Sequence, residues 1–193
     1  MGDPKKQRKK YEPPRFPWRT DVLKSELSLV GRYGLRNKRE LWSHKTTLSN
    51  FRGIARSLLG MSTEERKELE NQLVNRLNRL GILPETAKLD DVLDLNLEAI
   101  LERRLQTVVF RKGLAKSPHQ ARQLIAHGHV AIGGRKVSSP SYLVLKGEEE
   151  KITYAPTSPF SNPSHPLRES LSVTTEKVPK AQKAPEKIEE EKP

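Results

Sequence analysis

The segment HGHVAIGGRKV, from His127 to Val137, combines side chains suited to two kinds of chemistry. Its two imidazoles have the nitrogen donors that bind divalent metals, whereas Arg135 and Lys136 carry the charge that binds phosphate. Between them, Gly133 and Gly134 separate two short apolar runs, which predicts a two-residue hairpin turn with positive φ at both positions. The segment is therefore either a metal site or a basic hairpin that faces a polyanion.

The metal interpretation has little support in the sequence. His119 is the third imidazole nearby, but it begins a predicted helix that His127 ends, about two turns away. His127 and His129 flank a helix-ending glycine and are expected to diverge. The chain has no cysteine, and the nearest acidic residues are in the loop 148–150. We therefore expect no metal and no cofactor, and interpret the histidines as capping, packing or phosphate-contacting residues.

The charge balance favours a polyanionic partner. The 193 residues include 36 Lys and Arg against 24 Asp and Glu, a formal net charge of +12. This excess is carried by residues 1–19, 20–60 and 98–155, whereas residues 61–97 are net acidic. The basic, proline-rich start has no apolar core of a signal peptide, and no run is long enough for a membrane helix. We expect a cytoplasmic protein with no membrane partner.

The first two segments are predicted to be a basic arm, residues 1–19, and a helical domain, residues 20–96. The arm is proline-rich and contains Phe16 and Trp18, so it is either solvated or becomes ordered on nucleic acid. In the domain, apolar spacing predicts helices that end near Gly34, Gly60 and Gly81. The predicted RNA-binding residues of the second helix are Arg36, Lys38, Arg39, Lys45, Arg52 and Arg56.

Residues 97–155, called the C-terminal module below, are predicted to be two helices packed on a small antiparallel sheet. One helix runs from Asn96 to Gly113, and a second is capped by Ser-Pro-His-Gln; strands follow on both sides of the hairpin and at 141–145 and 151–154. The fold class is thus α+β. A helix N-terminus attracts phosphate. The predicted RNA-binding residues of the module are Lys112, Lys116, Ser117, His119, Arg122, Arg135 and Lys136.

These motifs carry a resemblance to a known family. LERRLQT, GLAKS, SPHQARQLI, HGHVAIGG and VSSPSY resemble the S-four RNA-binding domain, a module that also occurs on transfer-RNA synthetases and pseudouridine synthases. The flanking GRYGLRNKRELW, FRGIARSLL and RLNRLGIL resemble the archaeal and eukaryotic branch of the ribosomal protein S-four family. The resemblance covers roughly residues 4–160. It fails in the neutral, Pro-rich tail 156–193, which we expect to be largely disordered.

The resemblance implies a structural component of the small ribosomal subunit. Such a protein binds small-subunit ribosomal RNA, helps start subunit assembly, and contributes to accuracy near the channel through which messenger RNA enters. Its expected partners are that RNA, proteins S-three and S-five, and passing messenger RNA, with no small-molecule substrate. No catalytic motif is present, so we expect no enzyme. The alternatives are a trans-acting RNA-modification or stress factor that uses the same module, and a non-specific DNA compactor.

Overall fold

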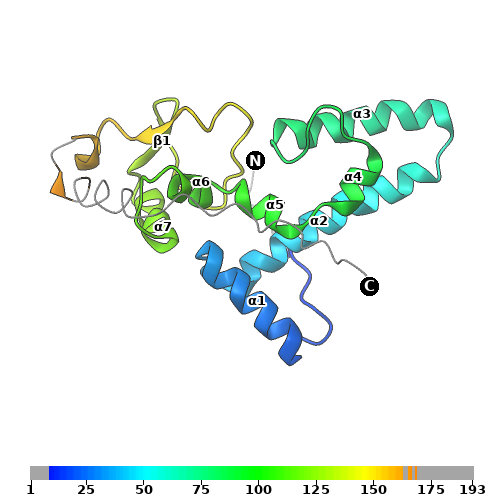
Figure 1. The fold of residues 1–193 in the computed structure, drawn as a ribbon, viewed down its shortest axis with the longest axis horizontal. Helices are drawn as coiled ribbons and strands as arrows, with labels where there is room; N and C mark the ends of the chain where they lie inside the picture. Colours follow the sequence, from blue (N-terminus) through cyan, green and yellow to red (C-terminus); the bar gives the residue numbers. More distant parts are fainter. Residues whose placement is uncertain (1–8, 163–164, 167, 169–193) are drawn as a thin grey trace, which may run out of the picture.

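The computed structural model describes residues 9–162, 165–166 and 168. The helical domain contains α1 (Thr20–Tyr33), α2 (Lys38–Leu59), α3 (Thr63–Arg79) and α4 (Leu89–Asp94), and α5 (Leu97–Glu102), the first helix after the predicted boundary, packs with them. In Figure 1, α2 and α3 lie side by side at one end of the molecule and the C-terminal module lies at the other. The three predicted helices of this domain are confirmed, whereas apolar spacing does not distinguish the short helices α4 and α5.

Apolar residues of α2 to α5 form the core of the helical domain. Leu48, Phe51 and Leu58 of α2 meet Leu73 and Leu77 of α3. The core is completed by residues of α2, of α4 and its C-cap, and of α5: Ala55, Leu89, Val92, Leu95 and Ile100. Because one stripe of each helix is covered in this way, the other faces of α2 remain free for charged residues.

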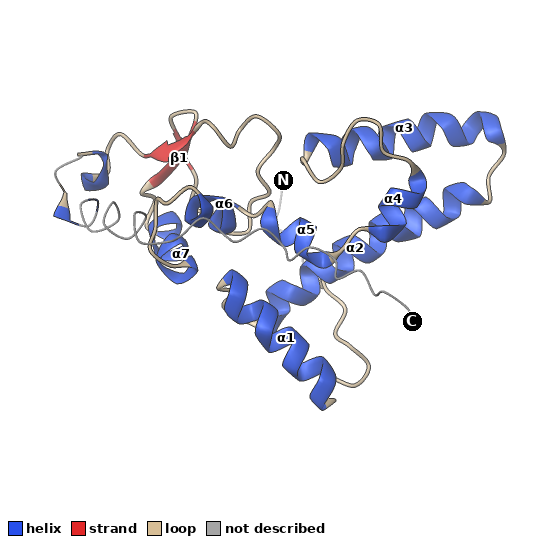
Figure 2. Ribbon diagram, in the orientation of Figure 1, coloured by secondary structure: helices blue, strands red, loops and turns tan. Residues whose placement is uncertain are grey.

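The C-terminal module has its own core around a three-stranded sheet. Its elements are α6 (Leu105–Arg111), α7 (Pro118–Ala126), β1 (Val130–Ile132), β2 (Arg135–Lys136), β3 (Ile152–Tyr154) and a 3₁₀ turn (Pro159–Ser161). The strands are antiparallel in the order β2-β1-β3, and Figure 2 shows them next to α6 and α7. The α+β class is confirmed. So is the hairpin, since Gly133 and Gly134 have φ of 55° and 83°.

The predicted continuous helix from Asn96 to Gly113 is wrong, because the chain leaves the helical path at Arg103 and Arg104. Here the backbone pairs with the chain around Leu143: Leu105 N donates to Tyr142 O at 2.7 Å, and Val144 N donates to Arg103 O at 2.9 Å. The predicted strand 141–145 contributes only this single bridge. Apolar spacing continues through the break, so periodicity alone does not reveal it.

The break also separates the two cores. Ile100 packs in the helical core, whereas Leu105 begins the core of the C-terminal module. The change of core therefore lies one short helix later than the boundary drawn at residues 96–97. At the other end, the start of the tail packs on the module, where Phe160 lies against its core. The rest of the tail lies mostly outside the described residues.

Candidate nucleic-acid interface

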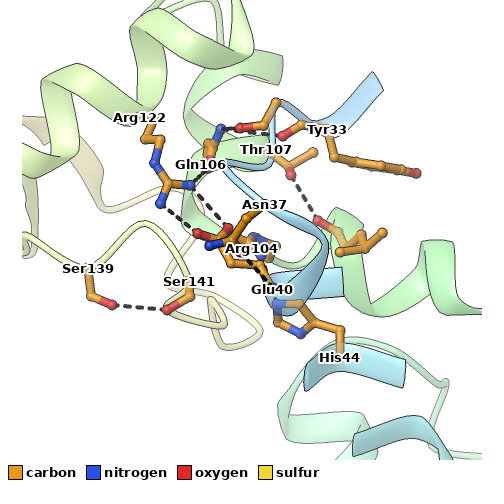
Figure 3. A network of polar contacts seen from close by, with 12 residues as sticks. Tyr33, Asn37, Glu40, His44, Arg104, Gln106, Thr107, Arg122, Ser139 and Ser141 are labelled. Atoms are coloured by element: carbon orange, nitrogen blue, oxygen red, sulfur yellow. Dashed lines mark hydrogen bonds and ion pairs between the residues drawn. The ribbon is translucent and has the colours of Figure 1, made fainter. Parts of the chain in front are cut away.

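A buried arginine joins the two parts of the protein. Arg104, in the break between α5 and α6, is 1% exposed and points toward α2, as Figure 3 shows. Its guanidinium donates to Glu40 Oε2 at 2.9 Å and lies 2.8 Å from His44 Nε2. Burial, with the neighbouring Arg104 charge, lowers the pKa of His44 to about 4. The imidazole is therefore neutral at pH 7, with its proton on Nδ1 and its Nε2 accepting from Arg104.

A second arginine binds the same carboxylate from the other side. Arg122 of α7 donates to Glu40 Oε1 at 2.6 Å and to Oε2 at 3.1 Å. Burial acts to raise the pKa of Glu40, but the hydrogen bonds and charges of Arg122 and Arg104 outweigh it and hold this pKa below its ordinary value. Glu40 thus stays ionised and links α2 to both α6 and α7.

Gln106 and Gly34 complete this connection. The Gln106 amide donates to Gly34 O at 2.7 Å and to Pro118 O at 3.0 Å. Gly34 ends α1 with φ of 61°, and a Cβ at this position would lie 2.6 Å from Pro118 Cβ. The end of α1 therefore touches the start of α7. We call this set the inter-module contact: Gly34, Glu40, His44, Arg104, Gln106, Pro118 and Arg122.

Cations from both parts of the chain adjoin residues of the inter-module contact. Arg36 and Arg39 follow Gly34 at the start of α2, while Lys116 and His119 flank Pro118 at the start of α7. All four are exposed. The Ser117 hydroxyl caps α7 by accepting from Gln120 N at 3.2 Å, and Gln120 Oε1 accepts from Lys116 N. The predicted cap at Ser117 is confirmed, but the return bond of the predicted capping box is not, because Gln120 accepts from the residue before the N-cap.

The predicted RNA-binding residues fall into two groups. Most are exposed and have no carboxylate within 4 Å among the described residues: Arg36, Arg39, Lys45, Arg56, Lys112, Lys116, His119, Arg135 and Lys136. The others have partners inside the protein. Arg122 binds Glu40, Lys38 lies 3.2 Å from Glu26 Oε2, and Arg52 donates to Leu95 O at 2.6 Å. Ser117 serves as the helix cap.

Sequence reasoning misses the roles of Glu40, Arg104 and Gln106. The helical pattern places Arg104 on a basic outer face with the neighbouring Arg103, which in fact packs on Gly81 and binds Glu149 and the carbonyl of Val144. The one available signal is Gln106, a polar residue beside the apolar stripe of its predicted helix. Its partners lie 72 and 12 positions away, so spacing could not identify them.

The histidines of the opening motif lie parallel, and the prediction that they diverge is wrong. The His127 and His129 rings stack at 6.2 Å between centroids and 9° between planes. His129 Nδ1 lies 2.9 Å from Ser158 Oγ, and its ring meets the edge of Phe160. The start of the tail therefore holds His129 in place. No group of three His, Asp or Glu side chains suited to a metal occurs in the part of the chain that the structure describes.

Comparisons with known proteins identify the family. Residues 103–149 match the family described as S4 domain. The chain is 60% identical over 161 residues to small ribosomal subunit protein uS4 of Hyperthermus butylicus, covering 83% of this chain and 92% of that protein. It is 56% identical over 167 residues to the uS4 protein of Sulfurisphaera tokodaii, covering 86% and 93%. The chain belongs to the small ribosomal subunit protein uS4 family.

This membership confirms the resemblance seen in the sequence, both for the S4 domain and for the flanking helical segments. It also agrees with the prediction that the chain is a ribosomal protein and no enzyme. Over the described residues, no helix combines the length and apolar character needed to span a membrane.

Proposed function

We propose that this uS4 protein binds small-subunit ribosomal RNA along the edge of the inter-module contact. The observation that carries the proposal is that exposed cations occur at the starts of both α2 and α7, next to the residues that connect the two helices: Arg36, Arg39, Lys116 and His119. Two basic segments held at a fixed separation suit the phosphates of a folded RNA, because such recognition depends on shape and backbone.

Within this proposal the predicted residues have two roles. The exposed cations contact phosphate, and those at the hairpin, Arg135 and Lys136, extend the surface along the C-terminal module. Arg122, Lys38, Arg52 and Ser117 act indirectly, because internal partners use their polar groups to hold α2 and α7 in place. The hairpin turn sets the direction of its two cations, since both glycines have positive φ.

The finer role follows from the family resemblance. We propose that the protein works in the cytoplasm within the small subunit, helps start assembly at a junction in the 5′ domain of the RNA, and contributes to decoding accuracy. Its neighbours would be proteins S-three and S-five and passing messenger RNA. The high similarity to uS4 relatives along most of both chains supports this assignment.

Binding to a transcript of the 5′ domain of small-subunit RNA tests the proposal. We expect log affinity to fall linearly with log salt, with a slope of about 0.7–0.9 per phosphate neutralised. Lys136→Gln should lower the affinity and the slope, whereas Lys67→Gln on the net-acidic segment should change neither. A flat salt response, or equal binding to duplex DNA, would contradict the proposal. A protein absent from salt-washed small subunits would favour the trans-acting alternative.

A further inference from the structure

The turn that precedes α1 holds two aromatic rings out of the protein. Trp18 is 85% exposed and Phe16 is 61% exposed, the highest values among the large apolar side chains that the structure describes as exposed. Both belong to the turn Phe16-Pro17-Trp18-Arg19, which is closed by Arg19 N donating to Phe16 O at 3.4 Å. The helical core does not use either ring.

This turn is anchored on both sides. Before it, Tyr11 stacks on Trp42 of α2 at 6.1 Å between centroids, and Glu12 N donates to Thr46 Oγ1 at 3.0 Å. After it, Arg19 O accepts from Leu23 N in the first turn of α1. The chain between these points is short and contains three prolines, which limits its freedom. The rings are therefore presented from a fixed position, and a ligand that stacks on them loses little entropy in ordering the protein.

The charge around the turn indicates which kind of ligand the two rings would bind. Arg15 lies over the Phe16 ring at 5.5 Å, and Arg19 adjoins Trp18. Cations also lie over a second ring of this arm. Lys9 Nζ is 4.9 Å and Arg39 Cζ is 5.5 Å from the centroid of the Tyr11 ring. An apolar partner protein would have to cover these guanidinium groups, whereas a nucleotide offers a base for the ring and a phosphate for the cation.

We propose that Phe16 and Trp18, flanked by Arg15 and Arg19, form a stacking platform for unpaired bases of small-subunit RNA. The inference rests on the proposed function and adds a second mode of contact to it. The edge of the inter-module contact binds phosphates of folded RNA near the end of α1, whereas the platform takes single-stranded bases at the start of this 14-residue helix. Stacking is tolerant of sequence because every base has a π face, so the platform would require an unpaired segment and no particular base.

Alanine and phenylalanine variants of Trp18 test this platform. With the 5′-domain transcript, Trp18→Ala should weaken binding about 5- to 150-fold, the range found when one stacked base is lost. Trp18→Phe keeps an aromatic face and should bind nearly as the unchanged protein does. The matched control is Leu69→Ala, which removes a 40% exposed apolar side chain from α3 and should leave affinity unchanged. The ratio between Trp18→Ala and wild type should stay constant as salt rises, because stacking releases no counterions.

Fluorescence gives a second readout. In Trp42→Phe, Trp18 is the remaining tryptophan, since the chain has two. Its emission should be quenched by the transcript and not by a fully paired RNA duplex. If wild type binds the transcript but Trp18→Ala binds equally well and Trp18 is not quenched, the platform is refuted and the proposed function stands. If Trp18→Ala binds RNA normally but is poorly retained in small subunits, the rings contact a neighbouring protein, and this result also overturns the proposal. Failure of wild type to bind the transcript would refute both the platform and the proposed function.

Discussion

Two pairs of cations in the C-terminal module have opposite surroundings. Arg104 and Arg122 converge on Glu40, and Arg104 is essentially removed from water. Arg135 and Lys136 stand exposed on β2, beyond 4 Å of every carboxylate in the described residues. The first pair is compensated by Glu40 inside the fold, with Arg104 buried and Arg122 partly buried, while the second remains hydrated and available. Positive charge therefore connects two parts of the chain at Arg104 and Arg122, and we propose that it attracts RNA at Arg135 and Lys136.

The difference lies in what surrounds each cation and not in its type. A buried guanidinium is stable only where hydrogen bonds and an opposite charge replace water, which Glu40 and His44 supply for Arg104. An RNA-binding cation needs the reverse: an exposed position with no neighbouring carboxylate to neutralise it. Substitutions that remove one cation at a time should therefore separate the two classes by their effects on unfolding and on RNA binding.

The largest effect on stability is expected for Arg104→Ala. Removing this side chain leaves the buried His44 without its donor and one oxygen of the partly exposed Glu40 with less compensation. We expect the free energy of unfolding to fall by about 3–5 kcal/mol, the usual cost of breaking a buried pair on one side. Chemical denaturation measures this directly. A decrease below about 1 kcal/mol would show that the inter-module contact contributes little to stability.

Gly34→Ala should be the next most damaging change. The residue has φ of 61°, and its new Cβ would lie 2.6 Å from Pro118 Cβ and 3.0 Å from Gln106 Nε2. Strain and overlap together should lower the free energy of unfolding by about 2–3 kcal/mol. Gly31→Ala is the matched control, because it lies within α1 and its added methyl would meet nothing within 4 Å beyond its chain neighbours and the nearby backbone of its own helix. It should be neutral or stabilising by up to about 1 kcal/mol in the same denaturation experiment.

Acid should weaken the inter-module contact through His44. Its pKa is about 4 in the folded protein against an ordinary value of 6.5, so protons bind the unfolded chain more readily. The contribution is complete above pH 6.5 and disappears as the pH falls toward 4. Between pH 7 and pH 5 we expect stability to fall by about 2 kcal/mol through this group. Denaturation at both values checks it. His44→Gln retains an acceptor for Arg104 and should lose this part of the pH dependence; an unchanged pH profile would argue against the assignment.

The sequence was sufficient to predict the features that depend on neighbouring residues. The helix end at Gly34, the cap at Ser117 and the turn at Gly133-Gly134 depend on local backbone preferences, and the structure has all three. The family motifs indicated the α+β module. The break at Arg104 could not be predicted, because it is created by pairing with Leu143, a residue 39 positions later in the chain whose strand is too short to show a pattern.

The same limit applies to the candidate site. Arg122 and Lys136 look equivalent in the sequence, which predicts RNA binding for both. Only the fold brings Glu40, from 82 positions earlier, against Arg122. Helix α2 has one carboxylate, Glu40, among cations on several faces, and the choice of face that meets α7 depends on packing of distant apolar residues. Ion pairs between residues far apart in the sequence can therefore be identified only from the structure, whereas the local sequence is enough to predict exposed cations at turns.

The smallest effect on stability is expected at the hairpin. Arg135→Ala with Lys136→Ala should change the free energy of unfolding by less than about 0.5 kcal/mol, because both side chains are exposed and make no ion pair with described residues. The same double variant should weaken binding to the 5′-domain transcript and reduce its salt slope by about one for each phosphate that the protein no longer neutralises. Arg122→Ala should instead lower stability while its folded form retains the slope, because Glu40 already neutralises this cation. If Arg122→Ala reduced the slope as the hairpin variant does, Arg122 would leave Glu40 for phosphate on binding, and the division between structural and RNA-binding cations would hold only for the free protein.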